Sequence, residues 1–475
     1  MAKFYSSLDE IKKDLQSGSI TVEGLVKNYL ASIKSNAHLN AFNEVFEQEA
    51  LSCSKTIDAR IKAGTAGRLA GMVIAIKDNI CYKGHKVSAS SKILADFTSI
   101  YSSTIVERLL SEDVIIIGRC NCDEFAMGGA NENSYYGPVK NYADPAKVPG
   151  GSSGGSAVAV QANMCHAAIG TDTGGSVRQP ASFCGLVGLK PTYGSISRHG
   201  VIAYASSFDQ VGPMTRSVED AALLLEIMGG ADEYDSTLDQ THVPAYSGAL
   251  EASTSKKTIA YLQEALSSPG VDDEVKNTLI QYIEKLRAEG HTVKPIAFEY
   301  LDYIVPTYYI LAMAEASSNL ARYDGVHYGY RSPAAVDLQS TYKRSRSEGF
   351  GKEVKRRIML GTFVLSAGYY DAYYAKAQKV RRLIKEKTDS LLQEFDFILT
   401  PTAPEPAFSL GKTEKDPVVM YLYDIFTVQA SLAGVPAISL PAGNNSKGLP
   451  IGLQLLTKRF AEQELLNFSK YFLEL

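Results

Sequence analysis

Two glycine- and serine-rich segments, separated by a short apolar run, constrain this chain more than any other feature. The first reads Pro-Gly-Gly-Ser-Ser-Gly-Gly-Ser over residues 149–156, and the second reads Gly-Thr-Asp-Thr-Gly-Gly-Ser-Val-Arg-Gln-Pro over residues 170–180. Glycine lets the backbone approach another group closely, and successive backbone N–H groups can converge on one point. The pattern predicts two tight turns joined by about one helix. Each turn presents a hydroxyl, from Ser152 or Ser153 in the first and Ser176 in the second.

Several known glycine-rich loops do not fit these residues. A phosphate-binding P-loop ends in Gly-Lys-Ser/Thr, and no lysine follows Gly154-Gly155. Neither segment contains the Gly-x-Gly-x-x-Gly pattern that binds dinucleotides between a strand and a helix. A nucleophile elbow, Gly-x-Ser-x-Gly, is excluded at Ser176 because Arg178 occupies the position of its last glycine.

The sequence predicts a buried strand that ends in a lysine. Residues 72–79 are Met-Val-Ile-Ala-Ile-Lys-Asp-Asn, an apolar run with β-branched residues followed by Lys77. A charged lysine is costly to bury, so a lysine in this position is usually paired or functional. One interpretation is a salt bridge with Asp78 or another carboxylate. The other is that burial lowers the pKa of Lys77 until the amine can accept a proton.

These residues suggest acyl transfer to a serine. A serine nucleophile needs a base, and none of the seven histidines lies in a motif typical of a triad partner. Lys77 can replace histidine if a second hydroxyl carries the proton between them. We therefore predict that Ser176 attacks, Ser152 relays the proton and Lys77 accepts it. The backbone N–H groups predicted to form the oxyanion hole are those of Thr173, Gly174, Gly175 and Ser176.

The composition limits the classes of partner and compartment. The 475 residues carry a formal net charge of −4, which argues against a chain that itself binds nucleic acid electrostatically. The N-terminus lacks the apolar region of a signal peptide, and no apolar run approaches the ~18 residues of a membrane span. The six scattered cysteines read as reduced, and Cys120-x-Cys122 has the wrong spacing for zinc. We expect a cytoplasmic protein with no metal site and no contact with a membrane.

Alternating strand and helix patterns predict an α/β fold. We expect three layers, α/β/α, around a central mixed, mainly parallel sheet, in a single domain that spans residues 1–475. Its parts are a helical N-terminal segment of about 1–65, a core of about 66–230 and a substrate-side and C-terminal part of about 257–475. Residues 203–209 and the Gly212-Pro213 pair read as loop. Long helical patterns are predicted over roughly 352–394 and over 417–433.

The motifs resemble those of the amidase signature family. The resemblance is carried by Ala-Ile-Lys-Asp-Asn at 75–79, by the glycine-rich segment at 149–156 and by Asp-Thr-Gly-Gly-Ser-Val-Arg-Gln-Pro-Ala at 172–181. That family uses a triad of serine, a second serine preceded by a cis peptide, and lysine. The resemblance implies the same triad, Ser176, Ser152 and Lys77, and the three-layer fold of the family.

Three further segments resemble the glutaminase subunits of glutamyl-tRNA(Gln) amidotransferases. They begin with Glu-Ala-Ser-Ser-Asn at 315, Glu-Val-Lys-Arg-Arg at 353 and Gly-Tyr-Tyr-Asp-Ala at 368. The resemblance implies that the chain hydrolyses glutamine and delivers ammonia to a B (kinase/transamidase) subunit, with a small C subunit completing a heterotrimer. It implies that tRNA binds mainly to B. It also implies no cofactor in this chain, with ATP and Mg²⁺ used by the complex at the partner subunit.

The same resemblance assigns glutamine recognition to Tyr308, Arg357, Asp424 and Gly129. A free amino acid requires a cation for its carboxylate and an anion for its ammonium group, which agrees with Arg357 and Asp424. Two alternatives stay open: Arg357 can belong to a solvated basic face, and Tyr309 can replace Tyr308. Ala130 and Asn131 depart from the usual family loop. The alternative function is a stand-alone amidase for other small amides; a catalytically silent scaffold is a more distant one.

Overall fold

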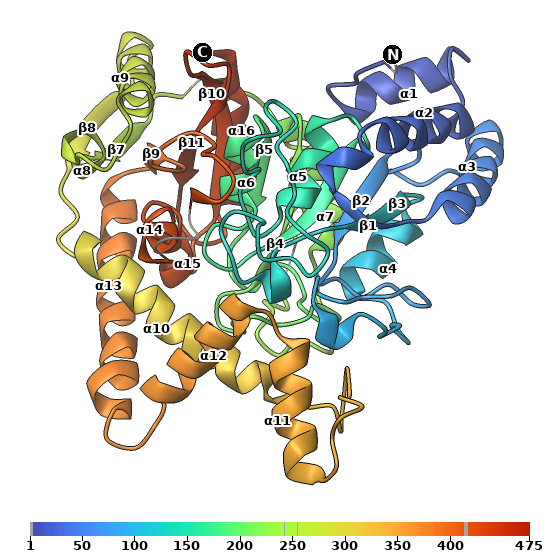
Figure 1. Ribbon diagram of the computed structural model, residues 1–475. Coiled ribbons are helices and arrows are strands. Elements are labelled where there is room, and N and C mark those ends of the chain that lie inside the picture. The colour runs from blue at the N-terminus through green and yellow to red at the C-terminus, as the bar shows by residue number, and fades with distance from the viewer. Residues whose placement is uncertain (1–2, 242, 254, 413–416) are drawn as a thin grey trace.

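One continuous sheet of eleven strands runs through the computed structural model, which describes residues 3–241, 243–253, 255–412 and 417–475 (Figure 1). In their order across the sheet, the strands are β1 (Phe42–Val45), β3 (Ile115–Cys120), β2 (Val73–Lys77), β4 (Ala167–Asp172), β6 (Gln210–Thr215), β5 (Val187–Lys190), β10 (Ala437–Asn444), β11 (Pro450–Leu456), β9 (Phe397–Pro401), β7 (Thr258–Leu262) and β8 (Thr292–Ile296). Strands from the N-terminal, central and C-terminal segments therefore pair in the same sheet.

The mixed α/β architecture is confirmed, but the expectation of mainly parallel pairing is wrong. The pairs β2–β3, β2–β4, β7–β8 and β7–β9 are parallel, whereas the other six pairs are antiparallel. Antiparallel strands can be joined by a short hairpin, as β10 and β11 are through residues 445–449, and need no crossover helix. The helix–strand alternation of the sequence predicted parallel pairing in most of the sheet, whereas the structure has it only toward the two ends of the strand order.

The strand β6 was not predicted, because its Gly212-Pro213 pair is typical of a loop. The strand nevertheless lies between β4 and β5, with Pro213 opposite Ile169. Glycine is required at position 212, because a Cβ atom there would lie 2.1 Å from the carbonyl oxygen of Leu189. The residues in front of this strand, which include Asp209, are thereby fixed beside the second glycine-rich turn.

Helices pack on both faces of the sheet (Figure 1). They are α1 (Leu8–Gln16), α2 (Val22–Ser35), α3 (Glu47–Lys62), α4 (Thr104–Ser111), α5 (Gly154–Gln161), α6 (Arg178–Phe183), α7 (Val218–Met228), α8 (Glu264–Ser267), α9 (Asp273–Ala288), α10 (Leu301–Asn319), α11 (Leu338–Gly349), α12 (Lys352–Val364), α13 (Lys376–Glu394), α14 (Pro417–Leu422), α15 (Val428–Ala433) and α16 (Glu462–Glu474). Shorter helical turns are η1 (Ala37–Leu39), η2 (Lys92–Leu94), η3 (Glu124–Ala126), η4 (Leu320–Arg322) and η5 (Tyr370–Ala375).

The core of the molecule lies around the parallel strands. β2, β3 and β4 are buried over their whole length, which fits their runs of valine, isoleucine and alanine between two covered faces. The helix α5 packs on these strands, and α6 packs on β5, β10 and β11. A second group is formed by α7, which contacts both α4 and α16. The two glycine-rich turns therefore open into α5 and α6 at the centre of the sheet.

Helix α10 packs against both α12 and α13, and these helices, together with α11, extend below the sheet in Figure 1. Both long helices predicted in this half of the chain are interrupted. The 352–394 pattern splits into α12 and α13, and the 417–433 pattern splits into α14 and α15. Between α14 and α15 the backbone forms tight turns in which each N–H bonds to the carbonyl three residues earlier, as from Asp424 to Tyr421 and from Thr427 to Asp424. This break directs Asp424 and Thr427 to the site.

Within the described residues, no helix combines the length and apolar character that crossing a membrane requires.

Candidate active site

The lysine predicted as the base lies completely buried at the end of β2. Its Nζ donates hydrogen bonds to Ser152 Oγ (2.7 Å) and to Thr171 Oγ1 (3.0 Å). Burial lowers the pKa of Lys77 from 10.5 to about 8, although nearby carboxylates oppose this shift. Asp78 does not pair with Lys77: it accepts from the backbone amides of Ser88 and Ser90. The interpretation of Lys77 as one half of a salt bridge with Asp78 is therefore wrong.

The first glycine-rich turn places Ser152 above this amine. The Gly151–Ser152 peptide bond is cis, and the N–H of Gly151 donates to Gln179 Oε1 (3.0 Å). A Cβ atom at position 151 would lie 2.2 Å from Asp123 Oδ2, so only glycine fits between this carboxylate and the turn. Ser153 points elsewhere, because its hydroxyl donates to the carbonyl oxygen of Thr171 (3.2 Å). The structure thus distinguishes the two serines, and Ser152 is the one that contacts Lys77.

Ser176 lies in the second turn, between β4 and α6, and keeps 8% of its surface exposed. Its carbonyl oxygen accepts from the N–H of Ser153 (3.3 Å), which joins the two turns. Both Ser152 and Ser176 belong to the described part of the chain, and their hydroxyls form no direct hydrogen bond with each other. Hydrogen bonds of this kind are often long in an enzyme without substrate.

A buried ion pair holds the backbone of the second turn. Arg178 donates from Nε to Asp172 Oδ2 (3.0 Å) and from Nη2 to Asp172 Oδ1 (3.0 Å). Burial alone would raise the pKa of Asp172, but the charge and hydrogen bonds of Arg178 keep it below its usual value. The same carboxylate accepts from the N–H groups of Gly175 (2.8 Å) and Val177 (3.2 Å). The turn is therefore fixed from within by one carboxylate.

This carboxylate bears on one predicted oxyanion donor. The Gly175 N–H donates to Asp172 Oδ1 (2.8 Å), and catalytic hydrogen bonds often tighten only once substrate binds, so its role in the oxyanion hole stays a prediction. The amides of Thr173, Gly174 and Ser176 have no acceptor among the described residues. Of the predicted oxyanion donors, these three are the ones whose N–H groups are unoccupied in the described structure.

Two side chains from distant segments press against the glycines of this turn. A Cβ atom at Gly174 would lie 2.5 Å from the Tyr308 hydroxyl oxygen, and one at Gly175 would lie 2.4 Å from Thr427 Oγ1. Gly175 also has a φ of +132°, which other residues rarely adopt. The Thr427 hydroxyl donates to the Gly174 carbonyl (2.6 Å). The contacts require glycine at both positions, and the backbone conformation requires it at position 175 as well.

Arg357 is buried in an aromatic cage, so the interpretation of a solvated basic face is wrong. Its guanidinium carbon lies between 5.4 and 5.7 Å from the ring centroids of Tyr204, Tyr309 and Tyr421. Nε donates to Glu353 Oε1 (2.9 Å) and Nη1 donates to the Tyr204 hydroxyl (2.9 Å). Within the described residues Nη2 has no acceptor, which leaves one edge of the guanidinium for a ligand.

Asp424 and the two candidate tyrosines have separate roles in the packing. The Tyr309 hydroxyl donates to Asp424 Oδ2 (2.6 Å), whereas the Tyr308 hydroxyl lies over Gly174 and has no hydrogen-bond partner among the described residues. Burial raises the pKa of Asp424 to about 7, against the hydrogen bond from Tyr309 and the charge of Arg357. Tyr308 therefore contacts the turn that carries Ser176, whereas Tyr309 contacts the carboxylate of Asp424.

The loop that carries Gly129 lies against the same turns. A Cβ atom at Gly129 would have Met420 Cγ at 3.7 Å and Gln179 Nε2 at 3.8 Å as its nearest neighbours. Gln179 Nε2 is buried without a partner in the described structure. Asn131, which departs from the usual family loop, accepts from the N–H of Gly155 through Oδ1 (3.0 Å) and so anchors the loop to the start of α5.

Sequence reasoning missed four polar side chains of this site, namely Thr171, Gln179, Asp209 and Thr427. Gln179 lies inside the second motif, three residues after Ser176, and this position in the motif could have identified it as a site residue. The contacts of Thr427 and Asp209 join segments that are distant in the sequence, so no local pattern marked them.

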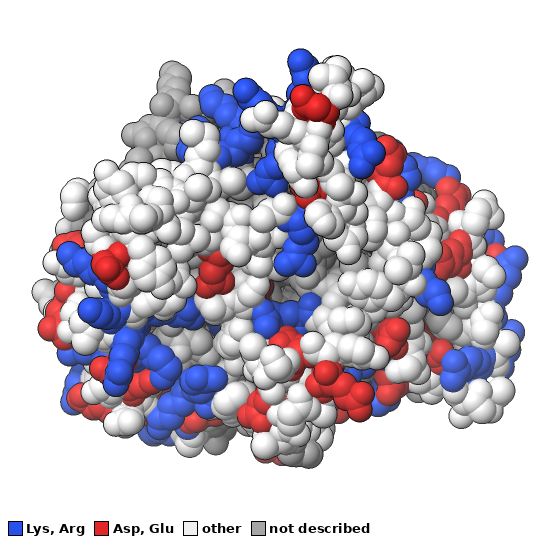
Figure 2. Space-filling view, turned by 90° about the horizontal axis from the view of Figure 1, so that it is seen from below, with Lys and Arg blue, Asp and Glu red and all other residues white. Residues whose placement is uncertain are grey.

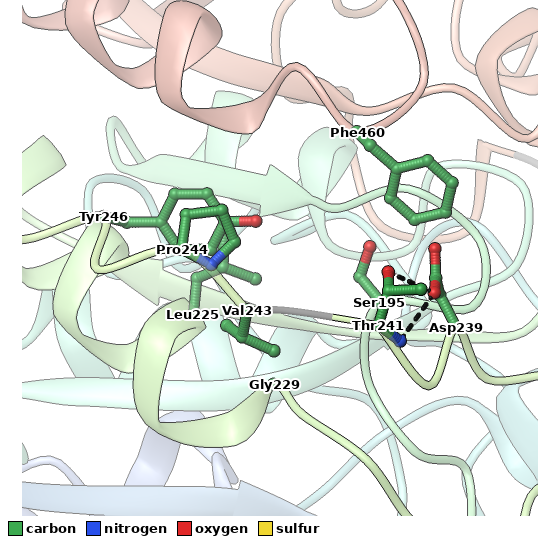
Figure 3. A pocket seen from close by; sticks show the side chains of 9 residues that line it. All are labelled: Ser195, Leu225, Gly229, Asp239, Thr241, Val243, Pro244, Tyr246 and Phe460. Carbon is green, nitrogen blue, oxygen red and sulfur yellow. Dashed lines mark hydrogen bonds between the residues drawn. The ribbon is translucent and has the colours of Figure 1, made fainter.

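A separate cavity of ≈ 330 Å³ contains none of the predicted site residues (Figure 3). Asp239 in its wall already accepts from the amide and hydroxyl of Thr241 (2.9 and 2.6 Å). In the part of the chain that the structure describes, no three His, Cys, Asp or Glu side chains form a metal-ligand group.

Comparison with known proteins agrees with this geometry. A sequence profile described as Amidase matches residues 24–466. The A subunit of the glutamyl-tRNA(Gln) amidotransferase of Chlorobium luteolum is 49% identical over 468 residues, which cover 98% of this chain and 96% of that protein.

Two solved structures are also similar. The crystal structure of the A subunit of glutamyl-tRNA(Gln) amidotransferase from Thermotoga maritima has a TM-score of 0.79 and 40% identity, covering 95% of this chain and 91% of that one. The native peptide amidase from Stenotrophomonas maltophilia has a TM-score of 0.81 and 28% identity, covering 98% and 95%. On the profile match and these near full-length similarities, the chain belongs to the amidase family.

Proposed function

We propose that this chain is the glutaminase subunit of a glutamyl-tRNA(Gln) amidotransferase, in which it hydrolyses glutamine to supply ammonia. The observation that carries the proposal is a site with two ends. At one end Lys77 Nζ lies 2.7 Å from Ser152 Oγ, and at the other Arg357 and Asp424 offer opposite charges. Free glutamine needs both ends, because its side-chain amide reacts while its carboxylate and ammonium group are held.

In the proposed reaction, Ser176 Oγ attacks the carbon of the glutamine side-chain amide. Its proton passes to Ser152, whose own proton passes to the neutral amine of Lys77. The oxyanion of the tetrahedral intermediate accepts from the amides of Thr173, Gly174 and Ser176.

Collapse of this intermediate breaks the C–N bond, and the proton returns through Ser152 to the leaving group, which departs as ammonia. Water then attacks the acyl-serine while Ser152 and Lys77 take its proton; the bond between the acyl carbon and Ser176 Oγ breaks, the relay returns the proton to Ser176, and glutamate leaves.

The proposal includes two partner proteins. A B subunit with kinase and transamidase activity would use ATP and Mg²⁺ to activate Glu-tRNA(Gln) and bind most of the tRNA, and a small C subunit would complete the heterotrimer. The net charge of −4 supports leaving the tRNA to a partner. On the face shown in Figure 2, basic side chains are interspersed with acidic ones, which also supports this division. We further propose a single domain, since all three predicted segments share one sheet, and a cytoplasmic location.

The second candidate is a stand-alone amidase, favoured by the similarity to the solved peptide amidase. The two functions differ in whether the substrate needs the charges of Arg357 and Asp424. An amidase for uncharged amides would retain its turnover after Arg357→Lys or Asp424→Asn, whereas the glutaminase would lose glutamine turnover in both variants.

The decisive experiment purifies the chain together with candidate B and C subunits and measures conversion of Glu-tRNA(Gln) to Gln-tRNA(Gln). Glutamine and free ammonia are compared as nitrogen donors. Under the proposal, Ser176→Ala abolishes the glutamine-driven reaction and leaves the ammonia-driven reaction unchanged. Loss of both reactions, or retention of both, would contradict the proposal.

A further inference from the structure

Asp209 joins the two ends of the proposed site, although neither the motifs nor the reaction scheme assigns it a role. The residue directly precedes β6 and is buried. Its Oδ1 accepts from the Thr173 hydroxyl (2.6 Å), and its Oδ2 accepts from the backbone N–H groups of Tyr204 (2.9 Å) and Ala205 (3.0 Å). Each oxygen of one carboxylate is therefore committed to a different segment.

The first segment is the turn that carries the nucleophile. Thr173 begins this turn, and its backbone amide is one of the predicted oxyanion donors. A hydrogen bond to its side chain fixes where the turn leaves β4, and thus where Ser176 lies three residues later. A charged acceptor forms stronger hydrogen bonds than a neutral one.

The second segment is the loop that places Tyr204 beside Arg357. The Tyr204 hydroxyl accepts from Arg357 Nη1 (2.9 Å), and its ring lies 5.7 Å from the guanidinium carbon. The carbonyl of Tyr204 accepts from Asn319 Nδ2 (3.2 Å), so this loop is held on both sides. A shift of Asp209 would therefore also shift Tyr204, whose hydroxyl orients the guanidinium of Arg357.

We propose that Asp209 is a positioning residue that sets the distance between Ser176 and Arg357, and thereby selects glutamine over the shorter amide asparagine. The inference rests on the proposed glutaminase function. Both amides share the same carboxylate, ammonium group and reacting carbon, and they differ by one methylene. If the positions of Ser176 and Arg357 are fixed relative to each other at a spacing that fits glutamine, asparagine cannot place its carboxylate at Arg357 and its amide carbon at Ser176 at the same time. A rigid connection therefore favours glutamine.

The test compares kcat and KM for glutamine and asparagine, measured as ammonia release by the complete chain with its candidate partners. In Asp209→Asn the charge is lost and one carboxylate oxygen becomes an NH₂ group, so the side chain can no longer accept hydrogen bonds from both segments at once, while its volume is kept. We expect kcat/KM for glutamine to fall on the order of 10–100-fold. We expect a smaller fall for asparagine, so the ratio of the two values decreases.

The ratio is the informative quantity because Asp209 also adds negative potential near Lys77. A changed base would slow both amides equally and leave the ratio unchanged. An unchanged ratio in Asp209→Asn would therefore overturn the inference. If the wild-type chain released no ammonia from glutamine, the proposed function itself would fail, which is a different result.

Two further variants divide the effect between the two ends. Thr173→Val removes the hydroxyl from the nucleophile turn and is expected to lower kcat for glutamine. Tyr204→Phe removes the acceptor of Arg357 and is expected to raise KM. Both variants should lower the ratio of glutamine to asparagine, and they serve as the test if Asp209→Asn does not fold. A ratio equal to that of the wild type in both would overturn the inference.

Asp232→Asn is the matched control. Asp232 is also buried, and it accepts from a threonine hydroxyl (Thr104) and from a backbone amide (Tyr234), but within the described residues none of its hydrogen bonds involves a predicted site residue. Its substitution tests the general cost of neutralising a buried aspartate and is expected to leave the ratio unchanged. A shift equal to that of Asp209→Asn would contradict the specific role of Asp209.

Discussion

The amine nitrogen of Lys77 lies 2.7 Å from the hydroxyl oxygen of Ser152, and both side chains are completely buried. Burial lowers the pKa of Lys77 to about 8, so roughly one amine in ten is neutral at pH 7 and about half at pH 8. A neutral amine in hydrogen-bond contact with a hydroxyl can accept its proton, and this relationship leads to the first three predictions.

The kcat/KM for glutamine should rise with pH and level off above about pH 8, because only the neutral form of Lys77 accepts a proton. Lys77→Arg should be inactive throughout, since arginine stays charged. The measurement is the initial rate at low glutamine over a pH series. A profile that shows no rise on approaching pH 8 would contradict Lys77 as the base.

Lys77→Met should stabilise the folded chain at neutral pH while it abolishes activity. The pKa of Lys77 is lower in the folded state, about 8, than its ordinary value of 10.5, so the unfolded chain binds more protons between these values. The free energy of unfolding then rises with pH through this window, and the charge is unfavourable below it. Thermal unfolding at neutral pH measures the effect.

Lys190→Met is the matched control for this prediction. Lys190 is also buried, and burial lowers its pKa to about 7, but among the described residues its amine donates only to the carbonyl of Pro191. This variant should also raise the unfolding temperature and should retain activity. A lower unfolding temperature in both variants would show that their hydrogen bonds outweigh the cost of burial.

Ser152→Ala should lower kcat by roughly 10²–10⁴-fold, because it removes the hydroxyl that carries the proton to Lys77. Ser153→Ala removes the neighbouring hydroxyl, which donates to Thr171 rather than to the amine, and should reduce kcat much less. Steady-state glutamine hydrolysis distinguishes the two. Equal losses would indicate that the turn as a whole, and not the relay, is required.

The KM for glutamine should rise as the pH falls below about 7. Burial raises the pKa of Asp424 to about 7, and a protonated Asp424 no longer attracts the ammonium group of the substrate. Asp424→Asn should give a high KM without this dependence on pH.

Tyr309→Phe should move the rise in KM to higher pH, because the Tyr309 hydroxyl stabilises the ionised form of Asp424. Tyr308→Phe is the control, since its hydroxyl makes no contact with this carboxylate, and it should leave the midpoint in place. A midpoint that is the same in Tyr309→Phe as in the wild type would argue against Asp424 as the titrating group.

Gly175→Ala should abolish activity and lower the unfolding temperature. The added Cβ atom would meet Thr427 Oγ1 at 2.4 Å, and the φ of +132° is unfavourable for alanine. Gly64→Ala separates the two effects, because Gly64 also has a positive φ of +69° but no atom within 4 Å of the new Cβ. Calorimetry should show the larger decrease for Gly175→Ala; equal decreases would remove the steric explanation.

The sequence alone was sufficient to predict the chemistry that we propose for this protein. The two serines and the lysine lie within contiguous motifs, and the energetic cost of a buried lysine made Lys77 conspicuous before any contact was known. The alternation of helices and strands likewise indicated an α/β fold. The α/β fold is confirmed, whereas the catalytic roles of the serines and the lysine stay predictions; each of these inferences could be made because it depends on residues that are neighbours in the chain.

Only the tertiary structure decided which groups meet. It shows that the Gly175 amide is occupied by Asp172, that Tyr309 rather than Tyr308 contacts Asp424, and that residues 210–215 form a central strand. The contact of Thr427 with Gly174 joins residues 253 positions apart, and that of Asp209 with Thr173 joins residues 36 apart. Local sequence patterns carry no record of such contacts, because the packing of whole elements brings these side chains together.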